Sequence, residues 1–236
     1  MEHIPFYPGL IVILTTLLSV FIIYRAAGKS RTVLLIAAAW LLLQAIAGKT
    51  GFYTHTAGTP PRFVLTIFPP IVLIAVLFIT ASGRRFIDSL NIRTLTLLHT
   101  IRIPVELVLW SLYLYKAVPQ IMTFGGRNLD IISGLTAPLI YYIVLVKKWA
   151  GTGLLLLWNI FCLLLLGNIV ITAILSAPFP FQQLGFEQPN IAVLYFPFCW
   201  LPGCIVPIVL FAHLVALRQL LNKKTIQNNL PAAYHA

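Results

Sequence analysis

Acidic residues are scarce in this sequence. Its 236 residues include 5 Asp and Glu against 16 Lys and Arg, and charged residues make up only 9% of the chain. Soluble domains carry about 25% charged residues, so the composition excludes an ordinary soluble fold. The formal net charge of +11 does not indicate a nucleic-acid partner, because the basic residues lie mainly between long apolar segments, as membrane topology signals do.

Cysteines and recognisable catalytic motifs are also scarce. The three cysteines, Cys162, Cys199 and Cys204, lie inside apolar segments and form no CxxC pair. We therefore expect buried thiols rather than a metal site. The chain has no GxSxG turn, Walker A loop, histidine box or Asp-rich metal motif, and its last apolar segment has no lysine to carry a retinal Schiff base.

Hydrophobic residues, by contrast, make up 60% of the chain, and seven apolar segments are long enough to cross a bilayer as helices. The sequence therefore predicts an all-α integral membrane protein, a seven-transmembrane-helix bundle over residues 1–222, followed by a polar cytoplasmic tail over residues 223–236. The predicted spans are residues 7–24, 32–48, 63–82, 94–115, 129–146, 151–176 and 190–217. Pro70, Pro104 and Pro202 are expected to kink the third, fourth and seventh spans.

The distribution of basic residues predicts an orientation. If the N-terminus lies outside, the inside segments hold eleven basic residues and the outside segments hold four. Because cytoplasmic loops are enriched in Lys and Arg, we expect the N-terminus outside and the C-terminus inside, in a plasma membrane or a bacterial inner membrane. The inside residues are Arg25, Lys29, Arg31, Arg84, Arg85, Arg93, Lys147, Lys148, Arg218, Lys223 and Lys224, and the outside residues are Lys49, Arg62, Lys116 and Arg127.

The fourth predicted span carries ionisable residues in its middle. A helical wheel places its polar and aromatic residues within a sector of roughly 80°, and these are His99, Arg102, Glu106, Trp110 and Tyr113. A charged group at mid-membrane costs about 2.5–3.5 kcal/mol on insertion scales, so this stripe must face other helices or a wet cavity. Arg102 and Glu106 stand four residues apart and are predicted to pair along the helix.

Two interpretations of the stripe stay open. In the functional one, Arg102 binds an anion or balances Glu106, Glu106 carries a proton or acts as an acid/base, and His99 relays protons. The two aromatic residues of the stripe, together with Tyr141, would then shape a ligand pocket. In the structural one, an internally neutralised pair only holds helices together.

The turn over residues 125–130, GGRNLD, is the second candidate for a ligand-binding segment. Arg127, Asn128 and Asp130 could form the outer mouth of the same cavity. Alternatively, Asn128 is the N-cap of the fifth span, and Asp130 complements the dipole of that helix from its first turn.

Two histidines raise the question of a cofactor. His99 and His213 are predicted at similar depth in the inner leaflet, where imidazoles from two helices could ligate haem or a metal ion. The chain lacks HxxxH spacing, so we expect no cofactor.

Three functions therefore remain open. The first is a carrier or channel-like protein for a small solute or ion, with or without coupling to protons. The second is a membrane-embedded isomerase or cyclase that transfers protons on a lipophilic substrate. The third is a non-catalytic membrane subunit. The expected partners are the lipid bilayer and a small-molecule or lipid ligand. A cavity that opens alternately to the two sides of the membrane would favour transport. A cavity that opens sideways to the lipid would favour the enzyme, and a stripe on the outer surface of the bundle would favour the subunit.

Reporter fusions test the orientation. Because of the excess of basic residues in the segments assigned to the inside, a reporter after Lys224 should report the cytoplasm and one inserted at Gly125–Gly126 the outside. Exchanged signals would show that the orientation is wrong.

Overall fold

The computed structural model describes residues 4–56, 58 and 60–222, and the regular structure in these residues is entirely helical. The α-helices are α1 (Phe6–Ala26), α2 (Arg31–Lys49), α3 (Val64–Ile79), α4 (Ala81–Ser89), α5 (Ile92–Leu98), α6 (Arg102–Leu114), α7 (Ile131–Ile140), α8 (Thr152–Leu175) and α9 (Val206–Leu221). Short 3₁₀ turns lie at Phe52–Thr54, His99–Ile101, Gln120–Met122 and Ala192–Leu194, and π-helical turns at Tyr141–Val146 and Leu201–Ile205.

In the part of the chain that the structure describes, five helices are long and apolar enough to cross a membrane, as expected of a helical membrane protein. They are Phe6–Ala26, Arg31–Lys49, Ile92–Leu114, Thr152–Leu175 and Leu201–Leu221. Helices α3 and α4 make a sixth candidate if they count as one span, although they are bent by 95° where they meet. The remaining predicted span corresponds to a shorter apolar helix, Ile131–Val146. The count of seven spans and the orientation stay predictions.

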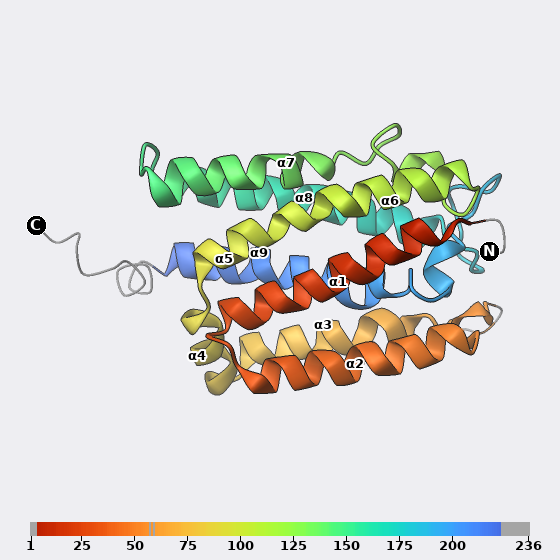
Figure 1. Ribbon diagram of the computed structural model, residues 1–236, viewed down its shortest axis with the longest axis horizontal. Helices are drawn as coiled ribbons and strands as arrows, with labels where there is room; N and C mark the ends of the chain where they lie inside the picture. The colour runs from red at the N-terminus through yellow and green to blue at the C-terminus, as the bar shows by residue number, and fades with distance from the viewer. Residues whose placement is uncertain (1–3, 57, 59, 223–236) are drawn as a thin grey trace, which may run out of the picture.

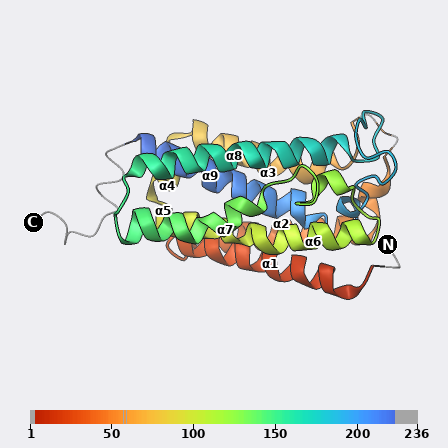
Figure 2. The ribbon, with the colours of Figure 1, turned by 90° about the horizontal axis from the view of Figure 1, so that it is seen from above.

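The helices form an elongated bundle around α9 (Figure 1). Helix α9 contacts α3, α4, α5 and α8. Helices α7 and α8 lie on one side of the bundle and α2 and α3 on the other (Figure 1), and Figure 2 shows the same helices from above. Helix α2 packs on α1 and buries only Leu41, Gln44 and Gly48, so it lies at the periphery.

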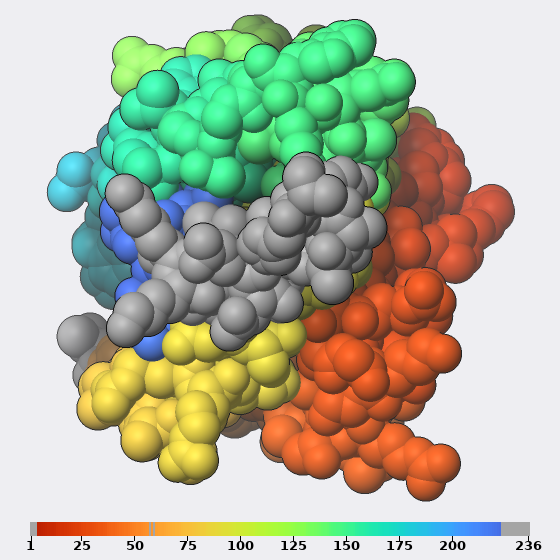
Figure 3. Space-filling model, turned by 90° about the vertical axis from the view of Figure 1, so that its left-hand side faces the viewer, coloured from red at the N-terminus to blue at the C-terminus, as the bar shows by residue number. Residues whose placement is uncertain are grey.

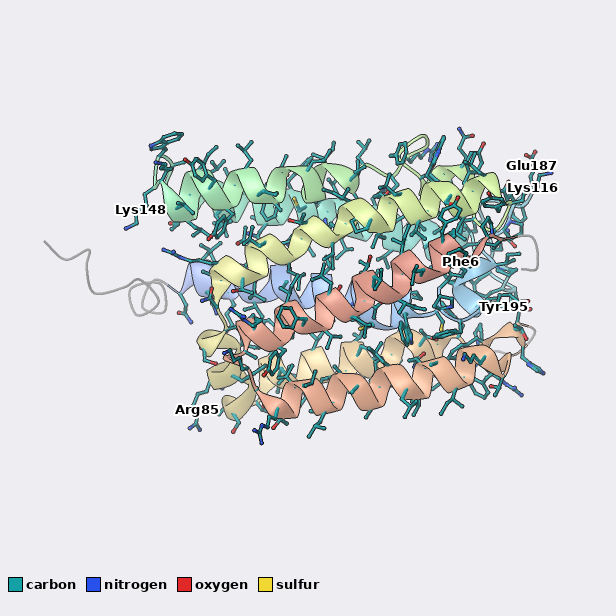
Figure 4. The ribbon with its side chains drawn as sticks, in the orientation of Figure 1. Phe6, Arg85, Lys116, Lys148, Glu187 and Tyr195 are labelled. Atoms are coloured by element: carbon teal, nitrogen blue, oxygen red, sulfur yellow. The ribbon has the colours of Figure 1, made fainter. Side chains whose placement is uncertain are left out.

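The connecting segments lie at the two ends of this bundle. Figure 4 labels Arg85 and Lys148 at one end and Lys116, Glu187 and Tyr195 at the other. Arg85 and Lys148 therefore lie at the same end of the bundle. The sequence assigns the segments that carry them to the same side of the membrane.

Two helices differ in their bounds from the spans predicted for them. The third was expected to continue to residue 82, but α3 ends at Ile79. Thr80 then caps α4 by accepting the N–H of Gly83 at 3.1 Å, and a Cβ on Gly83 would overlap the backbone of Leu77. The seventh was expected over residues 190–217, whereas the long helix covers Leu201–Leu221. The predicted tail over residues 223–236 lies outside the described residues.

Polar contacts hold the short helix α4 against the end of α9. The buried amide of Gln219 donates to the carbonyl oxygens of Ile87 and Leu90 at 2.8 and 2.9 Å. Next to it, the Arg218 guanidinium contacts the Asp88 carboxylate at 2.8 Å. These contacts satisfy backbone acceptors at the end of α4, where its own helical hydrogen bonds stop.

A tryptophan compensates for a proline in α9. In a regular helix, residue 207 would donate its N–H to the Gly203 carbonyl, but Pro207 has no N–H. The indole N–H of Trp40 in α2 donates to this buried oxygen at 2.7 Å. This hydrogen bond joins the peripheral α2 to the central helix.

Replacing Trp40 tests this connection. We expect Trp40→Phe to lower the free energy of unfolding by about 0.5–1.5 kcal/mol, the usual net contribution of a hydrogen bond, because the Gly203 carbonyl loses the indole donor. Thermal unfolding in detergent measures the change. Trp149→Phe is the matched control, since Trp149 is 73% exposed; equal melting temperatures for the two variants would contradict the role of Trp40.

Candidate functional site

The ionisable residues of the stripe are buried inside the bundle. His99, Arg102 and Glu106 are each no more than 2% exposed. They lie where α5 passes through the 3₁₀ turn His99–Ile101 into α6. This turn comes just before Pro104, which cannot donate to the carbonyl four residues earlier, so the helix tightens at the positions that carry the charged side chains.

Arg102 pairs with Asp130 of the loop before α7. Its Nη1 lies 2.6 Å from the Asp130 Oδ1 and also donates to the Cys162 carbonyl of α8 at 3.3 Å. The predicted pairing of Arg102 with Glu106 is therefore wrong: among the described residues, the only ion pair of Arg102 is with Asp130. The carboxylate that neutralises the guanidinium belongs to the residue directly before α7, so the pair joins α6 to the start of α7.

His213 of α9 extends this pair towards α8. Arg102 Nη2 lies 3.0 Å from His213 Nε2, and because arginine can only donate, Nε2 must be the acceptor. His213 Nδ1 then carries the proton and donates to the Asn159 Oδ1 at 2.9 Å. The Asn159 amide donates in turn to the Leu155 carbonyl at 2.8 Å, which fixes its orientation. His213 is thus neutral in this arrangement.

His99 and His213 meet, but as stacked rings. Their centroids are 3.8 Å apart with an interplanar angle of 18°, and Trp158 contacts His99 edge-on at 5.4 Å. Both nitrogens of His213 are engaged in hydrogen bonds, so neither has a lone pair free for a metal. The described residues contain no group of three His, Cys, Asp or Glu side chains that could hold a metal ion. This geometry does not fit the haem or metal considered for His99 and His213.

Asn128 connects Glu106 to the Arg102–Asp130 pair. Its amide donates to the Glu106 Oε1 at 2.5 Å and to the Met122 carbonyl at 3.0 Å. Its carbonyl oxygen accepts the backbone N–H of Asp130 at 3.1 Å. The N-cap of α7 is Asp130, so the expectation that Asn128 occupies this position is wrong. Asn128 instead links two acidic residues within the bundle.

A cavity of about 110 Å³ lies beside this network, between α3, α6, α8 and the start of the last long helix. Three of its lining residues have a buried polar atom without a hydrogen-bond partner among the described residues: Arg102 Nε, Glu106 Oε2 and Asn190 Oδ1. Most other lining side chains are apolar. Buried polar groups normally have partners, so the cavity offers one donor and two acceptors to a small guest.

The other predicted site residues lie apart from this cavity. Trp110 stacks on Phe124 with ring centroids 4.8 Å apart, and Tyr113 contacts Trp110. Arg127 is exposed. Tyr141 is half-buried at the start of the π-helical turn that follows α7. None of these four lines the cavity.

Two asparagines that were not among the predicted site residues also belong to the site. Asn159 orients His213, and Asn190 lines the cavity while donating to the Ala173 carbonyl at 3.2 Å. The signal for Asn159 is an amide within an apolar span. Asn190 stands in an irregular segment, where an asparagine is ordinary.

The same residues fall within a known sequence family. A family model described as "Domain of unknown function (DUF8737)" matches residues 60–221, more than half of the chain. The chain belongs to this family. The family segment contains the whole polar network and leaves out α1 and α2. No curated protein and no solved structure matches the chain.

The buried Arg102–Asp130 ion pair is expected to contribute to the stability of the fold. Removing one partner of a buried ion pair costs about 3–5 kcal/mol, whereas replacing both can be close to neutral. We therefore expect Asp130→Asn to lower the free energy of unfolding by that amount, and Arg102→Met/Asp130→Asn to lower it less. Thermal unfolding in detergent measures both.

The second ion pair supplies the control. The side chains of Asp88 and Arg218 are 28% and 25% exposed, and such pairs contribute about 0–1 kcal/mol. Asp88→Asn should therefore have little effect. A double variant as unstable as the sum of its single variants would argue against direct coupling between Arg102 and Asp130.

Proposed function

We propose that this protein binds a small polar solute or ion at the cavity beside Glu106 and moves it across a plasma membrane or bacterial inner membrane. The observation that carries the proposal is the set of unpartnered polar atoms, Arg102 Nε, Glu106 Oε2 and Asn190 Oδ1, on residues that line one cavity. Ionisable groups inside the membrane are costly and usually serve a function. A volume of about 110 Å³ suits a few waters or a small guest, since a water occupies about 30 Å³ in the liquid.

Glu106 is the residue best suited to exchange a proton. Asn128 holds one carboxyl oxygen, and the other has no partner among the described residues. Arg102 is already paired with Asp130, and within the described residues Glu106 makes no ion pair that would fix its charge. The free oxygen can bind a proton, a cation or a hydrogen-bond donor of the solute. A carrier in which proton and solute share one carboxylate can couple the movement of the solute to that of the proton.

Irregular helix geometry gives the cavity a wall that can move. Pro202 lines it within the π-helical turn Leu201–Ile205, and π-turns are frequent at functional sites. Carriers often build their sites from interrupted helices near the membrane midplane. We propose that this turn, together with the kinks at Pro70 and Pro104, allows the site to face each side of the membrane in turn.

A second candidate function is the acid/base enzyme acting on a lipophilic substrate. The observation that favours it is the edge of the cavity, where Ile67 of α3 and Val170 of α8 are half-buried and Ile174 is 37% exposed. In Figure 1 α8 lies above α9 and α3 below it, and residues of both helices line the cavity. A hydrocarbon substrate from the bilayer would enter between these helices, and Glu106 would then act on it. The subunit role has no comparable support, because the stripe is buried.

Proteoliposomes test the transport proposal. Vesicles containing the wild-type protein and the internal pH dye pyranine should take up protons when a transported solute is added from a panel of small anions, cations and neutral molecules. Glu106→Gln is nearly isosteric but cannot titrate, so we expect its proton uptake to fall to that of protein-free vesicles.

Asp88→Asn is the matched control, since it removes a carboxylate at the end of the bundle. It should behave as the wild type does. Proton-coupled uptake by Glu106→Gln at the wild-type rate would contradict the role of Glu106. A lipophilic molecule that co-purifies with the wild type and is converted by it, detected by mass spectrometry, would instead favour the enzyme.

A further inference from the structure

A second, larger cavity lies on the other side of α9. It has a volume of about 480 Å³, within the range of small-molecule and cofactor sites. It is formed where α1, α2, α3 and the last long helix meet, and its lining is almost entirely apolar. Representative lining residues are Ile36, Ala37, Leu73, Ile74, Pro207 and Phe211. The cavity is separate from the polar network and shares no lining residue with the cavity beside Glu106.

The few polar residues of this cavity gather at one end. Ser30 and Thr32 line it at the N-terminus of α2, and Phe86 lines it from α4. Figure 3 looks onto this end of the molecule, where α4 (yellow) lies beside α2 (orange). A long apolar cavity with a polar end has the shape and chemistry of a site for an amphipathic molecule.

The charge at this end is positive. Arg31 stands between the two polar lining residues Ser30 and Thr32, and Arg85 directly precedes Phe86. Both arginines are exposed, and neither makes an ion pair within the described part of the chain. The acidic residue of α4, Asp88, is already paired with Arg218. The two segments that contribute Ser30, Thr32 and Phe86 to this end of the cavity therefore each carry an exposed arginine.

The backbone at the N-terminus of α2 adds to the positive charge at this end of the cavity. Its 19 residues begin at Arg31, with Ser30 as N-cap. The first N–H groups of a helix lack internal partners and attract anions. Phosphate is the anion of membrane lipids, and basic pockets between membrane helices bind anionic headgroups.

We propose that this cavity binds an anionic phospholipid, with one acyl chain between α2, α3 and α9 and its phosphate near Arg31, Arg85 and the N-terminus of α2. The apolar lining accounts for the chain, and the basic mouth accounts for the charge of the headgroup. The site stands independently of the transport proposal, because it uses none of the residues around Glu106.

Native mass spectrometry of the full-length, delipidated protein tests the proposal. The probes are dioleoyl-phosphatidylglycerol and dioleoyl-phosphatidylcholine, which have the same acyl chains and differ in headgroup charge. The wild type should bind phosphatidylglycerol more tightly. Arg31→Gln/Arg85→Gln should lose about 10- to 30-fold of that affinity, the value expected for two basic residues near a lipid surface.

Two further variants separate the headgroup from the chain. Ala37→Trp places an indole in the apolar part of the cavity and should weaken binding of both lipids. Lys49→Gln/Lys116→Gln removes the same charge from segments away from this mouth and should bind as the wild type does. Equal unfolding temperatures for the variants and the wild type show that the fold is intact.

Three results would overturn the proposal. Equal affinity of the wild type for the two lipids would mean that charge is not recognised. An unchanged affinity of Arg31→Gln/Arg85→Gln for phosphatidylglycerol would place the headgroup elsewhere. Unchanged binding by Ala37→Trp would show that the lipid adheres to the charged surface without entering the cavity.

Discussion

The burial of one guanidinium group constrains the centre of this molecule. Arg102 is 2% exposed, and an unpaired charge in such a place is too costly to persist. Its partners come from the three other elements around it: Asp130 before α7, the Cys162 carbonyl of α8 and His213 of α9. Pairing the two terminal nitrogens of this one side chain therefore links four helical segments, and within the described residues Glu106 makes no ion pair.

The membrane class and the place of the site could be predicted from composition and periodicity. Long apolar segments indicate helices, and intramembrane His99, Arg102 and Glu106 are visible as exceptions to them. The partner of Arg102 could not be predicted in this way, because helical spacing reports neighbours within one helix. Glu106 at i+4 satisfied that local rule, whereas Asp130, 28 positions away, became adjacent only when α7 packed against α6.

The predicted helix boundaries differ from the observed ones where backbone hydrogen bonding, rather than hydropathy, determines where a helix ends. Residues 190–200 are apolar enough to extend the last span, yet they form the short 3₁₀ helix Ala192–Leu194 and separate turns rather than a continuous helix before Leu201. At the end of α3 a side-chain cap at Thr80 and a close approach at Gly83 change the direction of the chain. A hydropathy window averages over such single residues, so it could not locate either change.

The π-helical turn Leu201–Ile205 connects the two cavities physically. Leu201, Pro202 and Ile205 face the cavity beside Glu106, while Gly203 and Cys204 line the apolar cavity. Gly203 also approaches Thr66 of α3 so closely that a Cβ would lie 2.8 Å from the Thr66 methyl group. Because interiors are close-packed, this turn cannot shift towards one cavity without changing the volume of the other. A molecule that fills the apolar cavity therefore restricts the movement that the site beside Glu106 would need in order to open.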